Sequence, residues 1–185
     1  MAQSRRMLAI KNAREYLAVR PVFLDTETTG LGIGAEIIEI SVVDHDGTIL
    51  FDSLVKPARL IPLDAIQIHG ITNEMVRDAH LWKDVWPSLN QILNGRYIGI
   101  YNAEFDLKMV RQSHQIYNLP WDFPAGRVFD VMKLYSDYSG SRRWVSLDVA
   151  GRQCGISTLT NAHRARQDTL LLRAVFQFIA GQAPY

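Results

Sequence analysis

Residues 22–31 are the stretch that most constrains the fold of this chain, because an apolar run meets two carboxylates there. Residues 22–24 (Val-Phe-Leu) indicate a short buried strand that ends in a polar turn. Asp25 and Glu27 are two residues apart, and side chains i and i+2 of a strand point to the same face. Two carboxylates held this closely repel each other unless a proton or a cation lies between them.

A divalent cation would neutralise Asp25 and Glu27, and hard oxygen ligands favour Mg²⁺ or Mn²⁺. An acid-x-acid triplet also arises by chance in chains of this size, because acidic residues are common. The flanking residues favour a metal site. An apolar strand precedes the pair, and Thr28-Thr29-Gly30 predicts a turn directly after it.

The composition indicates one domain. The 185 residues have 48% hydrophobic content, enough for a substantial core, and no repeat or interdomain linker interrupts them. The formal net charge is +1, so bulk electrostatics do not indicate a nucleic-acid binder. Residues 1–20 carry five basic side chains and one acid, +4 in total, which leaves −3 for the remainder. A slightly acidic body fits a carboxylate cluster that binds metal.

Residues 1–20 are basic and nearly free of acids, a pattern that also occurs in organellar transit peptides. We favour a structural helix, because apolar residues recur on one helical face and residues 16–17 lead into the first strand without a linker. No apolar run approaches the roughly 18 residues of a membrane span, so we expect no membrane contact. The single cysteine, Cys154, excludes an internal disulfide and indicates a reducing compartment, which we expect to be the cytoplasm.

The remaining pattern predicts a mixture of strands and helices. Asp46-Gly47 between two β-rich segments is a strong hairpin signal, so the first three strands should form an antiparallel meander. After the first strand, which begins with the apolar run at 22–24, strands are expected at 36–43, 49–55 and 97–101, and residues 128–138 should hold a strand and a helix. Other helices are expected at 62–69, 72–76, 82–93, 103–117, 146–154 and 168–179, with Trp82 and Trp86 in the core.

Arg142, Arg143 and Trp144 form a basic loop with one aromatic residue between two of these helices. We favour a solvated loop; contact with a phosphate or a base is the alternative.

Asp106 is a third candidate carboxylate. It follows the buried strand at 97–101 and falls in the first turn of the next helix. Apolar residues spaced along that helix place Asp106 on its inward face, near the end of the preceding strand. A first-turn carboxylate can simply stabilise a helix N-terminus, which explains its presence but not its inward direction.

Asp168 extends the apolar stripe of the last helix, which continues at Leu171, Leu172 and Val175. A carboxylate on a core-facing stripe costs free energy unless it is paired or bound to a metal. His163 lies five residues earlier, and five helical steps rotate by about 140°, so the two cannot share one helix face. We therefore expect His163 on the loop that enters the helix, reaching the same site from the side.

These positions together resemble the DEDDh branch of the DEDD exonuclease superfamily, which includes the proofreading epsilon subunit of bacterial DNA polymerase III and ribonuclease T. The resemblance covers about residues 21–180. Three ordered motifs carry it, at 25–31 (Asp-Thr-Glu-Thr-Thr-Gly-Leu), 102–106 (Asn-Ala-Glu-Phe-Asp) and 163–168 (His-Arg-Ala-Arg-Gln-Asp), with weaker matches at 68–72 and 146–156.

The resemblance implies a ribonuclease H-like α/β fold, with a mixed five-stranded sheet and helices on both faces. We therefore divide the chain into a basic helical extension at 1–20 and an exonuclease domain at 21–182. The resemblance also implies hydrolysis from the 3′ end of single-stranded nucleic acid, DNA favoured, with release of nucleoside 5′-monophosphates.

By the same resemblance, Asp25, Glu27, Asp106 and Asp168 hold two Mg²⁺ or Mn²⁺ ions about 4 Å apart. One ion lowers the pKa of the attacking water, and the other stabilises the leaving 3′ oxygen. His163, with a reference pKa of about 6.5, is expected to accept the proton of that water at neutral pH.

The resemblance further implies that the backbone around Thr28 and the side chain of Leu31 hold the terminal nucleotide. Asp64 and His69 align with positions that touch this nucleotide in epsilon-like members, and Asn102 is expected to position it. The expected partners are therefore 3′ ends of single-stranded DNA or RNA.

Two features depart from the family pattern. Tyr101 stands where many relatives have histidine, which bears on substrate contact rather than on metal binding. The chain ends soon after the last motif and shows no extension like that by which the epsilon subunit attaches to its polymerase. We therefore expect a stand-alone nuclease and leave its oligomeric state open.

Three alternatives remain. An RNA-trimming exoribonuclease would use the same chemistry, since nothing identifies a reader of the 2′-hydroxyl. A non-catalytic nucleic-acid binding module would keep the fold, but all five expected catalytic positions are present. A structural protein with capped helices explains Asp106 but not the inward Asp168.

Overall fold

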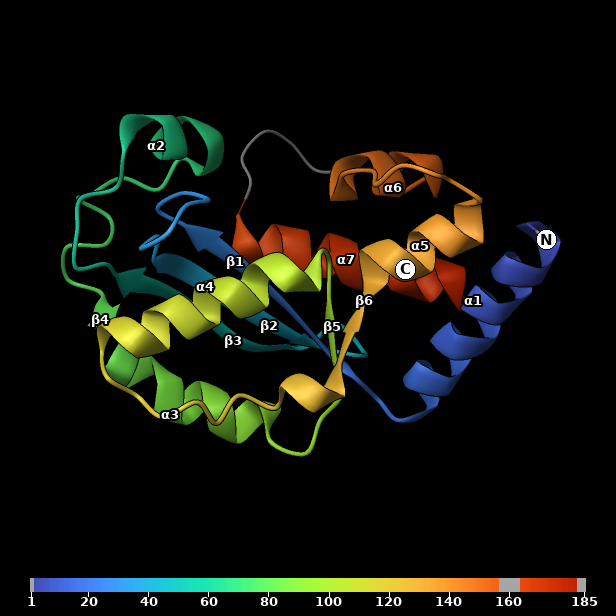
Figure 1. Cartoon of the computed structure of the whole chain (residues 1–185), viewed down its shortest axis with the longest axis horizontal. Coiled ribbons are helices and arrows are strands. Elements are labelled where there is room, and N and C mark those ends of the chain that lie inside the picture. Colours follow the sequence, from blue (N-terminus) through green and yellow to red (C-terminus); the bar gives the residue numbers. More distant parts are fainter. Residues whose placement is uncertain (1, 157–163, 183–185) are drawn as a thin grey trace.

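A six-stranded mixed sheet in the order β4-β3-β2-β1-β5-β6 runs through the molecule, with helices on both faces (Figure 1). The computed structural model describes residues 2–156 and 164–182. The strands are β1 (Val22–Thr28), β2 (Ile37–Asp44), β3 (Ile49–Lys56), β4 (His80–Leu81), β5 (Ile98–Ile100) and β6 (Val128–Asp130). The helices are α1 (Ala2–Ala18), α2 (Leu63–His69), α3 (Trp82–Leu93), α4 (Ala103–Ile116), α5 (Val131–Ser139), α6 (Leu147–Gln153) and α7 (Ala165–Ile179). Within the described ranges, no helix has the length and apolar character needed to cross a bilayer.

The meander expected from the sequence is confirmed, because β1, β2 and β3 pair antiparallel in chain order. Its second turn closes with the Asp44 N–H donating to the Thr48 carbonyl at 2.8 Å, and Gly47 has φ +100° there. In contrast, β5 pairs parallel with β1, and β6 pairs parallel with β5. The carboxyl ends of these three strands therefore lie at one edge of the sheet, where polar sites commonly form.

Two expectations were wrong in detail. The sheet has a sixth strand because His80–Leu81 pairs parallel with the end of β3, and two residues are too few to show any periodic pattern. The helix expected at 72–76 is a series of turns with i to i+3 bonds, such as the Met75 N–H to the Thr72 carbonyl at 3.1 Å. A segment this short cannot overcome the cost of helix nucleation without packing support.

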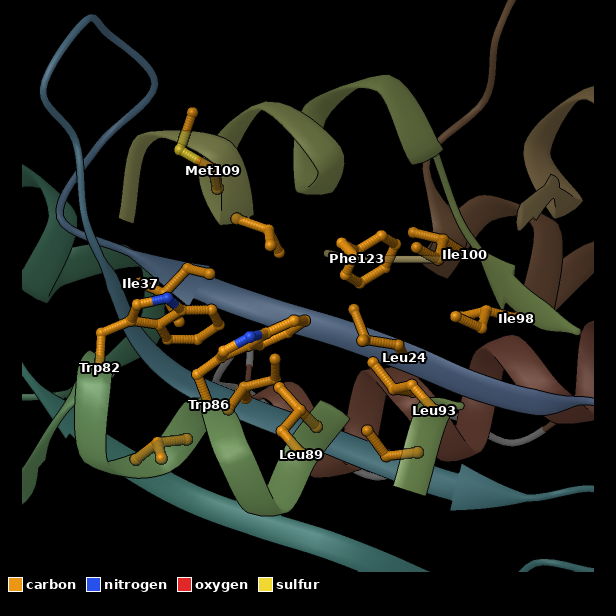
Figure 2. Close-up of a cluster of buried hydrophobic side chains, with 14 of the residues drawn as sticks. Leu24, Ile37, Trp82, Trp86, Leu89, Leu93, Ile98, Ile100, Met109 and Phe123 are labelled. Atoms are coloured by element: carbon orange, nitrogen blue, oxygen red, sulfur yellow. The ribbon is translucent and has the colours of Figure 1, made fainter. Parts of the chain in front are cut away.

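The first hydrophobic core lies between the sheet and the pair α3 and α4. Trp82 and Trp86 of α3 stack with ring centroids 5.7 Å apart, and both are buried, as the sequence predicts. Figure 2 shows Trp86 on the side of Leu24 of β1 and Trp82 beside Ile37 of β2, and Phe123 contributes to the same core. The even-numbered side chains of β1 therefore face α3 and α4.

The second core lies on the opposite face, between the sheet and α7, α5 and α6. Phe23 of β1 meets Phe176 of α7 at a centroid distance of 5.2 Å. The N-terminal helix α1 joins this core through the buried Ala13 and through Tyr16, which stacks on Phe129 of β6 at 4.1 Å. The expected helix at the N-terminus is thus confirmed, while the division of the chain at residue 20 stays a prediction.

Gly99 of β5 lies where a side chain has no room. A Cβ atom there would approach Phe129 Cζ and Phe23 Cδ1 to 2.8 Å each. We expect Gly99→Ala to lower the free energy of unfolding by about 1–3 kcal/mol, because the packed rings must shift. Chemical denaturation measures this change. Gly126→Ala is the control, since no atom lies within 4 Å of its added Cβ; equal stabilities for the two variants would contradict the expectation.

Candidate active site

Three carboxylates converge at the carboxyl end of β1. Asp25 and Glu27 come from β1 and Asp168 from the first turn of α7, and one ligand oxygen of each lies within 4.8 Å of the others. All three side chains are half-buried. The expectation that these residues meet is confirmed, and the arrangement offers hard oxygen ligands suited to a divalent ion.

The packing of α7 places Asp168 at this point. Leu172 and Val175 of α7 are fully buried in the second core, which includes Phe23 of β1. Asp25 and Glu27 share the face of Phe23 because they follow it at i+2 and i+4. The apolar stripe of α7 and the odd-numbered face of β1 thus bring the carboxylates together.

Asp106 reaches the site from the opposite face of the sheet. It lies in the first turn of α4 and is only 3% exposed, so its inward direction is confirmed. The Thr26 hydroxyl donates a hydrogen bond to Asp106 Oδ1 at 2.7 Å. Thr26 lies between Asp25 and Glu27 on β1 but points to the other face. It was not singled out from the sequence, although its place on the α4 side of the strand was readable from the alternation.

The electrostatics of the cluster favour a bound cation. Burial, followed by the charge of Asp168, raises the pKa of Glu27 to about 8. Burial and the charges of Asp106 and Asp168 raise the pKa of Asp25 well above its usual range. Burial also raises the pKa of Asp106 to about 7, although the bond from Thr26 opposes the shift. Protons or metal ions must therefore offset the charges, and the residues present fit a divalent metal.

The loop after β1 carries the first two substrate-binding candidates. Thr28 is buried, and its hydroxyl donates to the Gly30 carbonyl at 2.8 Å. Leu31 is 77% exposed. The Lys108 ammonium of α4 donates to the Leu31 carbonyl at 3.1 Å and so connects this loop to the helix that carries Asp106.

The other candidates lie on three different segments. Asp64 is exposed in the first turn of α2, and His69 is buried at the end of that helix, where its Nδ1 accepts the Ile71 N–H at 3.0 Å. Asn102 precedes α4 in the left-handed conformation, with φ 62°. His163 lies outside the described residues. The roles of these residues stay predictions.

Two polar residues beside the cluster were missed by sequence analysis. Glu39 of β2 is the cross-strand partner of Glu27, and the Arg164 guanidinium bonds both of its carboxylate oxygens. Only the strand register and the packing of α7 bring them together.

The basic loop is attached to the same edge of the sheet. The Tyr101 hydroxyl, just after β5, donates to the Val145 carbonyl at 2.9 Å. Trp144 next to it is 62% exposed. Tyr101, which departs from the family pattern, thus holds the loop in place.

The raised pKa values predict how the stability of the metal-free protein depends on pH. The folded-state pKa values of Glu27 and Asp106, about 8 and about 7, exceed their unfolded values of about 4. The folded protein therefore binds more protons than the unfolded chain across this window. The stability contributed by these groups is full below about pH 4 and is lost as the pH rises through about 8.

Asp25→Asn should consequently raise the melting temperature of the metal-free protein at pH 8, with a smaller gain at pH 5. Each 1 kcal/mol corresponds to about 2–4 °C in a domain of this size. Thermal unfolding in chelator at both pH values measures the effect. Asp137→Asn, which removes an exposed acid of α5, is the control. An equal gain at both pH values, or none, would show that repulsion in the cluster does not limit stability.

Comparisons with known proteins agree with this geometry. The model of the exonuclease family RNase_T matches residues 22–176. The chain is 36% identical over 180 residues to the uncharacterized exonuclease CP81 of Escherichia phage 186, covering 92% of this chain and 93% of the phage protein. It is 28% identical over 175 residues to the DNA polymerase III subunit epsilon of Buchnera aphidicola, covering 88% and 73%.

Solved structures give the same result. Exonuclease X in complex with 5′ overhanging duplex DNA has a TM-score of 0.65 and 28% identity, covering 88% of this chain and 94% of that chain. The nuclease domain of 3′hExo, a DEDDh family member bound to rAMP, has a TM-score of 0.76 at 19% identity, covering 90% and 95%, and so shares the fold. The family model and the phage relative span most of the chain, and the chain therefore belongs to the RNase_T exonuclease family.

Proposed function

We propose that this protein hydrolyses the terminal phosphodiester bond at the 3′ end of single-stranded nucleic acid, with DNA favoured, and releases nucleoside 5′-monophosphates. The observation that carries the proposal is the convergence of Asp25, Glu27 and Asp168 at one sheet edge, with Asp106 beside them. A binding module without catalysis would have no use for a carboxylate cluster that destabilises its own fold and repels phosphates.

The four carboxylates would hold two divalent ions, Mg²⁺ or Mn²⁺. Such ions, when bound, polarise the scissile phosphate and lower the pKa of a water molecule. The protein supplies the geometry for this chemistry. Asp25 and Glu27 are fixed by the central strand, Asp106 is oriented by the Thr26 hydroxyl, and Asp168 is carried by α7. Because these residues lie on a central strand and in the first turns of two packed helices, their carboxylate oxygens stay close together even without a metal ion.

His163 is the proposed general base. Its reference pKa of about 6.5 lets the neutral imidazole accept the proton of the attacking water near neutral pH. It directly precedes Arg164 in the chain, whose side chain is held by Glu39. This attachment fixes the residue after the base close to the carboxylates.

Thr28, Leu31, Asp64, His69 and Asn102 would hold the terminal nucleotide. The exposed Leu31 offers an apolar surface to a base, and the loop that carries it is bonded to α4. Among the structural relatives, exonuclease X was solved with duplex DNA and the 3′hExo nuclease domain with rAMP. RNA trimming at the same site is therefore the alternative function. We place the protein in the cytoplasm on the basis of its single, unpaired cysteine.

The direct test is degradation of 5′-labelled, sequence-matched single-stranded DNA and RNA with Mg²⁺, Mn²⁺ or chelator. We expect a ladder of products shortened stepwise from the 3′ end, abolished by chelator, with the faster substrate identifying the preferred sugar. His163→Ala should slow the reaction by about 100-fold or more, since a general base contributes that much. Immediate release of labelled mononucleotide would instead indicate the opposite direction. Lack of degradation of either strand by folded, metal-supplied protein would favour a binding module.

A further inference from the structure

Glu39 is a fifth carboxylate beside the cluster, and the proposed function leaves it without a role. It is 4% exposed and lies directly across the β1–β2 ladder from Glu27. Side chains at such positions are neighbours, with Cβ atoms about 4.5–5.5 Å apart. A buried carboxylate next to another one costs free energy unless hydrogen bonds and a positive charge compensate it.

Two residues at the start of α7 provide this compensation. Arg164 Nε lies 3.0 Å from both carboxylate oxygens of Glu39, and Arg164 Nη2 donates to Oε1 as well. The Ala165 N–H donates to Glu39 Oε2 at 2.9 Å. Three N–H groups therefore occupy the Glu39 carboxylate, which makes Glu39 a poor candidate for a metal ligand.

The same contacts fix the beginning of α7. Arg164 is the N-cap residue of this helix, and its own side chain makes no cap bond. The Glu39 carboxylate of β2 instead accepts an N–H from the first turn of α7. It also places a negative charge at the N-terminus of this helix, which is favourable. The Arg164 carbonyl in turn accepts the Asp168 N–H at 3.0 Å. A continuous set of bonds thus links β2 to the backbone of a cluster carboxylate.

We propose that Glu39 and Arg164 form a positioning pair that holds Asp168, and the chain next to His163, in register with Asp25 and Glu27. The inference rests on the proposed function for its catalytic consequence. Its structural part, the formation of the metal site, is independent of catalysis. Glu39 and Arg164 touch neither metal nor substrate in this proposal and act through α7.

The pair also has an electrostatic consequence. Arg164 pairs with Glu39 and so offsets part of the negative charge that Glu39 adds beside Asp25 and Glu27. Without the guanidinium, the Glu39 carboxylate opposite Glu27 would lose its positive partner and would be free to compete for the metal. Pairing with Arg164 thus keeps Glu39 in a structural role and leaves metal binding to the carboxylates of the cluster.

The test compares Arg164→Gln, Arg164→Lys, Glu39→Gln and the double Gln variant. Arg166→Gln is the matched control, because Arg166 lies two residues further along, is 53% exposed and pairs with Asp52 at 3.6 Å. Calorimetric titration with Mn²⁺ alone gives metal affinity without substrate, and steady-state kinetics on an oligonucleotide give kcat and KM. Melting temperatures confirm that each variant is folded.

We expect Arg164→Gln to weaken Mn²⁺ binding or lower kcat by about 10–100-fold, as for other residues that orient metal ligands. KM for the oligonucleotide should change less than about twofold. Arg164→Lys should rescue little, because an ammonium cannot reproduce the two-nitrogen fork. The double variant should be no worse than the more damaged single one, since the two residues act as a unit. Arg166→Gln should match the wild type.

Three results would overturn the proposal. A raised KM with unchanged Mn²⁺ affinity and kcat would make Arg164 a phosphate contact. Equal behaviour of Arg164→Gln and Arg166→Gln would remove any special role for the pair, and additive losses in the double variant would mean that the two residues act separately. If the wild type binds Mn²⁺ but degrades no strand, the proposed function fails. The Mn²⁺ affinities of the wild type and the variants would still show whether Glu39 and Arg164 position the metal site.

Discussion

Mutual repulsion of carboxylates at the end of β1 is the constraint on which the rest of the structure depends. Asp25, Glu27 and Asp168 each place a carboxylate oxygen within 4.8 Å of the others, and Asp106 is near enough for its charge to raise the pKa of Asp25. No local preference of the chain would hold four acids there. Two separate hydrophobic cores do so, because β1 is packed on both faces and each core delivers one helix to the same edge of the sheet. Apolar burial thus sustains an arrangement that is unfavourable without metal, a common cost of function.

Polar residues on both faces of the sheet help to hold the carboxylates of the cluster in place. On the α4 face, the Thr26 hydroxyl orients Asp106. On the α7 face, Glu39 holds the start of the helix that carries Asp168. Both supporting residues come from central strands, whose positions are the least free to vary. The two carboxylates carried by helices are therefore each supported from a central strand, Asp106 from β1 and Asp168 from β2.

The sequence predicted the parts of the site that depend on local periodicity. The i, i+2 spacing placed Asp25 and Glu27 on one face, and the helical stripes correctly directed Asp106 and Asp168 inward. The meander and all the longer helices also followed from pattern. The two-residue β4 did not, because it forms only when β3 is already present to pair with it.

The support for the site could not be predicted for a different reason. Glu39 and Arg164 are 125 residues apart, and nothing near either residue marks it as one of a pair. In the sequence, Glu39 reads as the polar position of an alternating strand. Its neighbour Glu27 is fixed by the register of β1 against β2, with an irregularity directly after that position. Pairing of this kind emerges from tertiary packing, which a single sequence does not encode in any local pattern.

The charge of the site also determines how a nucleic acid can approach it. The formal net charge of the chain is only +1, and the clustered carboxylates at the site repel a phosphate backbone until cations bind them. Metal binding should therefore precede strand binding. Exposed apolar and aromatic side chains at this edge, Leu31 and Trp144, suit contacts with bases rather than with phosphates. Binding through contacts with bases releases few counterions from the phosphates, so the affinity for the strand should depend weakly on the salt concentration. It should depend strongly on the divalent ion, which offsets the charge of the carboxylates.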